Sequence, residues 1–250
     1  MKKKLFFIIL IFLFCKLGFA ASDVTKPMNY KFSFDGLLGS LDKNSAQRGL
    51  QVFTEVCASC HGLKHLAYRN LEDIGYDKNQ INNIAKQFLV DDIPDENGEI
   101  KKRNAIYSDN FVDPYPNEEA AKAANNGAYP PDLTLIIKAR KDGANYLRSL
   151  LLGYEDTPEG FDVGEGYYNK YMPGKIIAMP QPLYGEDIEY QDGTNPTLEQ
   201  EVIDVVTFLT WASMPELEKR KSSGIKVVIF LVVMTFFFFL SYRKIWKEIK

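Results

Sequence analysis

The stretch that most constrains this chain is Cys57-Ala58-Ser59-Cys60-His61. A C-x-x-C-H run is the attachment signature of a c-type haem. Two thiols at this spacing can add across the two vinyl groups of a porphyrin, and the adjoining histidine then lies under the ring and offers its imidazole nitrogen to the iron. The motif therefore predicts one haem c, covalently attached through Cys57 and Cys60, with His61 as an axial ligand.

Two other chemistries use closely spaced cysteines. A zinc knuckle needs a second pair of cysteine or histidine ligands downstream, and none follows this motif. A thiol–disulfide exchange motif does not need a histidine directly after its second cysteine. Both alternatives are weaker than haem attachment.

The N-terminus has the pattern of a secretory signal. Three lysines follow the initiating methionine, an apolar run comes next, and Gly18-Phe19-Ala20 forms a small-x-small cleavage site. The apolar run is short for a membrane span, so we expect residues 1–20 to be cleaved and Cys15 to leave with them. The haem motif then holds the remaining cysteines, which are too few for a disulfide framework.

A second apolar run, residues 225–242, lies near the C-terminus and is interrupted only by Lys226. At about 1.5 Å per residue this run covers roughly 27 Å, enough to cross a bilayer core. We predict one transmembrane helix over 225–242 and a cytoplasmic tail over 243–250. Because the signal exports what precedes the span, the haem domain is expected on the periplasmic side of a bacterial inner membrane.

Residues 21–221 are expected to form one domain, long enough to bury a sizeable core. The first 20 residues carry four lysines and no acid, and residues 222–250 carry five basic residues and one acid. The whole chain's net charge of −3 therefore leaves −11 on the domain. This sign argues against nucleic acid and favours a basic partner.

Helical periodicity dominates this domain, and neither a repeat nor a convincing strand pattern is visible. Ser45 and the Thr197-x-x-Gln200 capping box are candidate helix starts, and Gly49 would let another helix approach closely. The expected helices cover residues 45–57, 77–90, 118–124, 132–141, 145–152 and 197–214, with an acidic surface insertion over 91–117 and loop over 153–197. The predicted fold is mainly α: a cytochrome c-like helical haem domain with long loops and an insertion, plus one C-terminal transmembrane helix.

The iron needs a second axial ligand or keeps an open position. His65 lies one helical turn from His61 and would project to the same side of the ring, so we interpret it as a surface histidine. Of the methionines, Met172 and Met179 lie in the proline-rich loop before the last predicted helix, where a rigid backbone could hold a thioether against the iron. Two prolines close after Met179 favour it over Met172.

Four stretches of the chain together resemble the cytochrome c1 family, the haem subunits of ubiquinol–cytochrome c reductase (cytochrome bc1) complexes. They are residues 56–69 around the haem motif, 124–133, 139–154 and 173–194. The last predicted helix, the basic residues after it and the single C-terminal span complete the resemblance. Two departures are the glycine and lysine after His61 and the absence of a spare cysteine for the extra disulfide of some members.

The resemblance implies that Met179 is the second axial ligand and that Arg140 pairs with a haem propionate. Asn125 and Pro131 match residues that line the haem pocket. The protein is then expected to be a one-electron carrier without bond-making catalysis of its own. Its implied partners are cytochrome b, the Rieske iron–sulfur protein and a cytochrome c.

Two other functions remain open on sequence alone. A membrane-tethered c-type cytochrome could feed a terminal oxidase outside a bc1 complex. An enzyme with an open haem site, such as a peroxidase, would not need a methionine near the iron.

Overall fold

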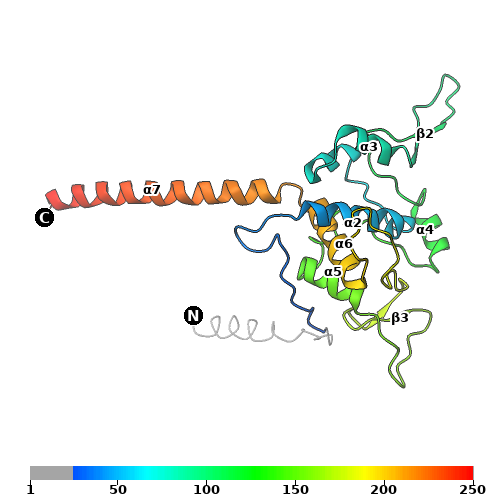
Figure 1. Ribbon diagram of the computed structural model, residues 1–250. Coiled ribbons are helices and arrows are strands. Elements are labelled where there is room, and N and C mark those ends of the chain that lie inside the picture. The colour runs from blue at the N-terminus through cyan, green and yellow to red at the C-terminus, as the bar shows by residue number, and fades with distance from the viewer. Residues whose placement is uncertain (1–24, 250) are drawn as a thin grey trace, which may run out of the picture.

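The computed structural model describes residues 25–249, so the expected signal over 1–20 lies outside the described residues. The described chain is mainly helical, as predicted (Figure 1). Its elements are α2 (Lys43–Glu55), the 3₁₀ helices η1 (Cys57–Ser59) and η2 (Tyr68–Ile74), α3 (Lys78–Ala85), β1 (Leu89–Asp91), β2 (Lys102–Asn104), α4 (Glu118–Ala124), α5 (Gly143–Leu152), β3 (Tyr167–Tyr168), β4 (Ile176–Ile177), α6 (Leu198–Ser213) and α7 (Leu217–Ile249).

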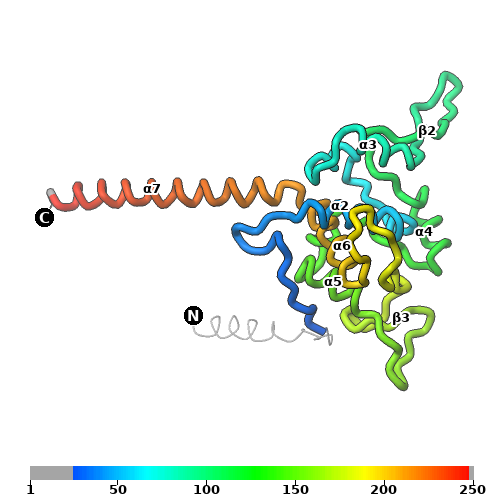
Figure 2. The backbone as a smooth tube through the Cα atoms, in the orientation of Figure 1, coloured from blue at the N-terminus to red at the C-terminus, as the bar shows by residue number. Residues whose placement is uncertain are grey.

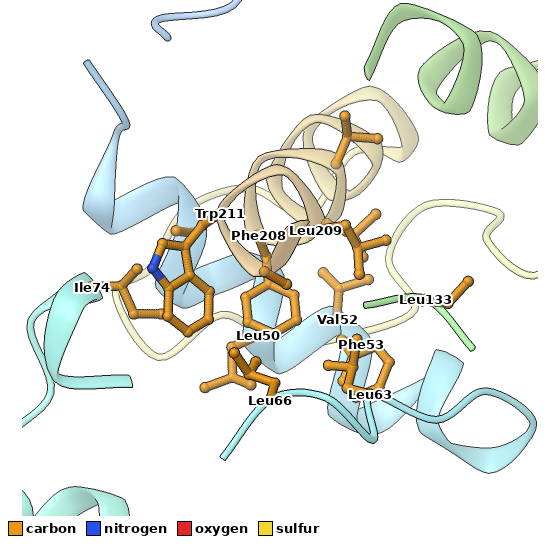
Figure 3. Packing of buried hydrophobic residues seen from close by; sticks show 14 of the residues in the cluster. Leu50, Val52, Phe53, Leu63, Leu66, Ile74, Leu133, Phe208, Leu209 and Trp211 are labelled. Carbon is orange, nitrogen blue, oxygen red and sulfur yellow. The ribbon is translucent and has the colours of Figure 1, made fainter. Parts of the chain in front are cut away.

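The core forms where α2 crosses α6 (Figure 3). Gly49 lies at the closest approach, since a Cβ there would overlap the carbonyl oxygen of Asp204 and crowd the Cβ of Phe208. Leucine, valine and aromatic side chains from both helices interdigitate around this point, together with Leu63 and Leu66 from the loop after the haem motif. The expectation that Gly49 admits a second helix is confirmed.

A buried polar network also joins α2 to α6. The carboxylate of Asp204, whose side chain is fully buried, accepts hydrogen bonds from Ser45 Oγ at 2.6 Å and from Arg48 Nε at 2.8 Å. Ser45 was the expected cap of α2, but the helix begins at Lys43 because the Asp42 side chain accepts from the backbone N–H groups of Asn44 and Ser45. The serine hydroxyl is used across the helix pair instead.

The other helix predictions hold to different extents. α4 has the predicted bounds, α5 begins two residues early, and α6 starts as predicted after Thr197, whose side chain accepts from the Gln200 N–H. The capping box is only half formed, because the Gln200 side chain donates to Asp204. Both α4 and α6 owe their bounds to local caps.

The prediction of a helix over 132–141 was wrong, because this segment is a run of turns. The Asp132 carboxylate accepts from the N–H of Lys64 and of Thr134, and the Leu133 N–H donates to the carbonyl of Gly62. These bonds tie the backbone to the loop after the haem motif, so it cannot continue as a regular helix.

Two strand pairs also correct the expectation of no strands. The helix expected over 77–90 ends at Ala85, and after three residues of turn Leu89–Asp91 form β1, which pairs antiparallel with β2 of the predicted insertion. A two-residue pair, β3 with β4, lies within the stretch expected to be loop. Such short strands carry too few residues to show an alternating pattern.

The last element, α7, begins at Leu217 and projects alone from the globular part (Figures 1 and 2). It is long and apolar enough to cross a membrane, and its apolar side chains are exposed on all sides. The predicted span over 225–242 forms the middle of this longer helix, so the boundary at 221 and the separate tail at 243 do not coincide with helix ends.

Candidate haem site

The Cys57–His61 motif forms a tight turn directly after α2. α2 ends at Glu55, η1 begins at Cys57, and the N–H groups of Cys60 and His61 both donate to the carbonyl of Cys57, at 3.1 and 2.9 Å. Ser59 Oγ donates back to the carbonyl of Val56. Both cysteines are free thiols held on one compact turn, which is the arrangement that attachment to a porphyrin requires.

His61 is oriented by a residue far along the chain. Its Nδ1 lies 2.7 Å from the carbonyl oxygen of Pro131. A carbonyl only accepts hydrogen bonds, so Nδ1 carries the proton and Nε2 keeps a free lone pair. Burial lowers the pKa of His61, against the opposing effects of the Pro131 carbonyl and Asp132. The imidazole is thus neutral at pH 7 and has one nitrogen available to a metal.

The electrostatics of the thiols distinguish the possible chemistries. Burial, with a smaller effect of Cys60, raises the pKa of the Cys57 thiol to about 12. Thiol–disulfide exchange needs a thiolate, and its reactive cysteines have depressed pKa values. Over residues 25–249, moreover, no three His, Cys, Asp or Glu side chains group closely enough to hold a metal ion. The described residues around the motif therefore fit neither thiol–disulfide exchange nor a multi-ligand zinc site.

Asn125 reaches the motif through a residue that sequence reasoning missed. Its Nδ2 donates to Tyr115 Oη at 3.1 Å and to the carbonyl of Ala121 at 2.7 Å, and Tyr115 Oη lies 3.8 Å from Cys60 Sγ. Tyr115 falls in the stretch interpreted as a surface insertion. The only available signal was its position between two prolines in an otherwise polar segment.

Met179 and Met172 have different surroundings. Met179 is half-buried, packs against the same hydrophobic cluster as Cys57, and has its carbonyl held by Tyr154 Oη at 3.0 Å. The Met172 sulfur lies 3.8 Å from the hydroxyl of Tyr146. Of the two loop methionines, Met179 therefore shares the core beside the motif and has a fixed backbone.

Arg140 is not joined to the motif by any contact among the described residues. Its side chain is exposed, and its Nη1 donates to the neighbouring carbonyl of Ala139 at 3.2 Å. Pairing with a haem propionate stays a prediction. His65 is also exposed, as expected of a surface histidine.

Comparison with known proteins gives one consistent result. The sequence profile of the Cytochrome C1 family matches residues 32–249. The chain is 45% identical over 224 residues to "Cytochrome c1 2, heme protein, mitochondrial" of Arabidopsis thaliana, covering 89% of this chain and 73% of that protein. It is 42% identical over 236 residues to "Cytochrome c1" of Rhodospirillum rubrum, covering 88% and 87% respectively.

A third relative is longer than this chain. "Cytochrome b/c1" of Bradyrhizobium diazoefficiens is 40% identical over 246 residues, which cover 89% of this chain but only 36% of that protein. The chain thus spans about a third of the length of this relative.

Proposed function

This chain belongs to the cytochrome c1 family, and on that premise we propose that it holds one haem c and carries single electrons between redox proteins of a bc1 complex. Its relatives are named as haem proteins and, in one case, as a cytochrome b/c1. Thioether bonds from Cys57 and Cys60 would fix the haem beside the core.

The hydrogen bond from His61 Nδ1 to the Pro131 carbonyl carries this proposal. It sets the tautomer and the ring orientation of His61, and a bonded Nδ1–H would make the opposite nitrogen a better donor to iron. The bound haem would supply one-electron redox chemistry. The protein supplies the ligands, their orientation and the surrounding polarity.

Met179 is proposed as the second axial ligand. A thioether opposite a histidine favours reduced iron and raises the haem potential. Tyr154 holds the Met179 backbone at 3.0 Å, which would keep the sulfur in reach. With His61 and Met179 both holding the haem, the site would take part in electron transfer alone, as suits a carrier rather than a peroxidase.

The remaining pocket residues would act around the ring. Asn125 and Tyr115 form a hydrogen-bonded pair next to Cys60, and together they would cover one edge of the attachment turn. Arg140 is proposed to pair with a propionate. Its exposed guanidinium is not committed to a carboxylate among the described residues.

We further propose that electrons arrive from the Rieske iron–sulfur protein and leave to a cytochrome c. Support comes from the family and from the charge of −11 on residues 21–221. An acidic surface speeds the encounter with a basic carrier, and the effect weakens as salt rises. α7 would hold the globular domain beside cytochrome b, with the haem on the periplasmic side, residues 243–250 in the cytoplasm and residues 1–20 removed.

Purification of the tagged protein from native membranes tests this proposal. Cytochrome b and a Rieske protein should co-purify, and the reduced-minus-oxidised spectrum should show b-type and c-type bands together. Quinol should then reduce an added basic cytochrome c at a rate that falls with ionic strength. Co-purification with an oxidase, with no Rieske protein present, would instead identify a tethered cytochrome outside a bc1 complex.

A further inference from the structure

A short loop beside the start of α7 exposes two leucines. Leu37 and Leu38 are 68% and 85% exposed, whereas Phe32 and Phe34, just before them, are 4% and 6% exposed. Single exposed apolar residues are ordinary on a protein surface. An adjacent exposed pair at the tip of a loop whose stem is buried in the core requires a more specific explanation.

The loop has a defined structure. The rings of Phe32 and Phe34 stack with their centroids 4.8 Å apart. The Asp35 carboxylate accepts from the Phe32 N–H at 2.8 Å, and the Ser40 N–H donates to the carbonyl of Ser33 at 3.1 Å. Gly36 takes the positive φ of 72° that turns the chain. The two leucines are therefore held outward by an ordered stem.

Lys221 of α7 ties this loop to the membrane helix. Its Nζ donates to the carbonyls of Phe34 at 2.5 Å and Gly39 at 2.9 Å, the two residues that flank the tip. In Figures 1 and 2 the loop, in mid-blue, reaches out from the globular part on the side toward which α7 leaves. The leucines thus lie next to the segment that enters the bilayer.

Helix geometry gives the position of Lys221 relative to the hydrocarbon core of the bilayer. The apolar run of α7 over residues 225–242, which contains one charged residue, Lys226, begins four residues after Lys221. At about 1.5 Å per residue this places Lys221 about 6 Å above the hydrocarbon core, within the headgroup layer. A loop tip projecting from there along α7 reaches the boundary between headgroups and acyl chains.

A cavity of about 440 Å³ lies between the loop and the start of α7, and charged side chains line it. Its charged lining residues are the cations Lys138, Arg140 and Lys221 and the acids Asp35 and Asp142. Basic side chains such as Lys138 and Lys221 next to an apolar insertion are typical of surfaces that rest on lipid headgroups.

We infer that the loop over residues 35–39 inserts Leu37 and Leu38 into the outer lipid layer beside α7, giving the globular domain a second contact with the bilayer. One helix alone leaves a domain free to tilt and rotate about its axis. A second contact, fixed to that helix by Lys221, restricts the orientation in which the haem faces its redox partners. The inference rests on the proposed membrane anchoring by α7.

Depth-dependent fluorescence quenching of the full-length protein in phospholipid nanodiscs tests this contact. The probe variant is Leu38→Trp. Ile93→Trp is the matched control, because Ile93 is 84% exposed but lies in the loop that joins β1 to β2, a hairpin on the far side of the globular part from α7 (Figure 1). In the unmodified chain, quenching of Trp246 by brominated lipid reports whether α7 is inserted at all.

The Leu38→Trp emission should shift to the blue and lose most of its added intensity when the lipids carry bromine near the headgroup end of their acyl chains. The Ile93→Trp emission should lose none. Trp246 quenching without Leu38→Trp quenching would overturn the lipid contact while leaving the anchor intact, and equal quenching of both variants would also overturn it. A blue-shifted Leu38→Trp emission that appears only in the assembled complex, without quenching by brominated lipid, would assign the loop to a protein partner instead.

Discussion

The Nδ1 atom of His61 donates to the carbonyl oxygen of Pro131, 70 residues further along the chain, over 2.7 Å. The same two segments are joined again by the Leu133 N–H to the Gly62 carbonyl and by Asp132 to the Lys64 N–H. Three hydrogen bonds between residues 61–64 and residues 131–133 therefore position the histidine. The orientation of the His61 imidazole is thus set by a long-range contact of the fold.

Replacement of Met179 tests the axial assignment. Met179→Ala should lower the haem potential by on the order of 0.1 V or more, within the roughly 0.8 V that axial ligands span, or leave an iron that binds CO when reduced. Met172→Ala is the control, since its sulfur contacts Tyr146, and it should change neither property. A potentiometric titration measures the haem potential, and a CO-difference spectrum detects CO binding. A changed potential or CO binding in Met172→Ala, with neither change in Met179→Ala, would assign the ligand to Met172.

Gly49→Ala should destabilise the globular domain because its new methyl group would overlap the Asp204 carbonyl oxygen in α6. Overpacking of this kind costs about 1–3 kcal/mol, measurable as a lowered urea midpoint in detergent. Gly224→Ala provides the matched control: it is also a helical glycine, but a Cβ there meets nothing within 4 Å. Equal midpoints for the two variants would show that the α2–α6 contact is looser than described.

The charge on Asp204 should contribute far more to the free energy of unfolding than the charge on Asp192, although both carboxylates bind Arg48. The side chain of Asp204 is fully buried, and that of Asp192 is 46% exposed. Asp204→Asn leaves the Arg48 cation without its buried partner, which typically costs 3–5 kcal/mol. Asp192→Asn should cost no more than about 1 kcal/mol. Urea titrations of the two variants measure both free energies of unfolding, and equal losses would contradict the prediction.

The contribution of Glu201 to stability should fall as pH rises from about 4.5 to 7. Glu201 is fully buried, and desolvation with the nearby charge of Asp187 raises its pKa to about 7. Over this range the unfolded chain has released the proton that the folded chain still holds, so unfolding becomes easier until the pH passes 7, with a total effect of about 3 kcal/mol. Glu201→Gln should flatten this part of the stability profile, and an unchanged slope would exclude Glu201 as its source.

The sequence predicted features that depend on neighbouring residues. The starts of α4 and α6 depend on local side-chain caps, and both helices were found where expected. Ser45 was mistaken for a cap because its hydroxyl bonds Asp204, 159 residues away. The turns after Asp132 and the role of Tyr115 likewise depend on contacts with the motif loop. Such long-range bonds leave no periodic pattern in the sequence.

Covalent haem attachment is the central claim, and mass spectrometry tests it most directly. After acid–acetone extraction, the intact mature protein should be heavier than its polypeptide by the mass of one haem. The Cys57→Ser/Cys60→Ser double variant should show the polypeptide mass alone. Loss of haem from the unmodified protein, or its retention by the double variant, would contradict the account.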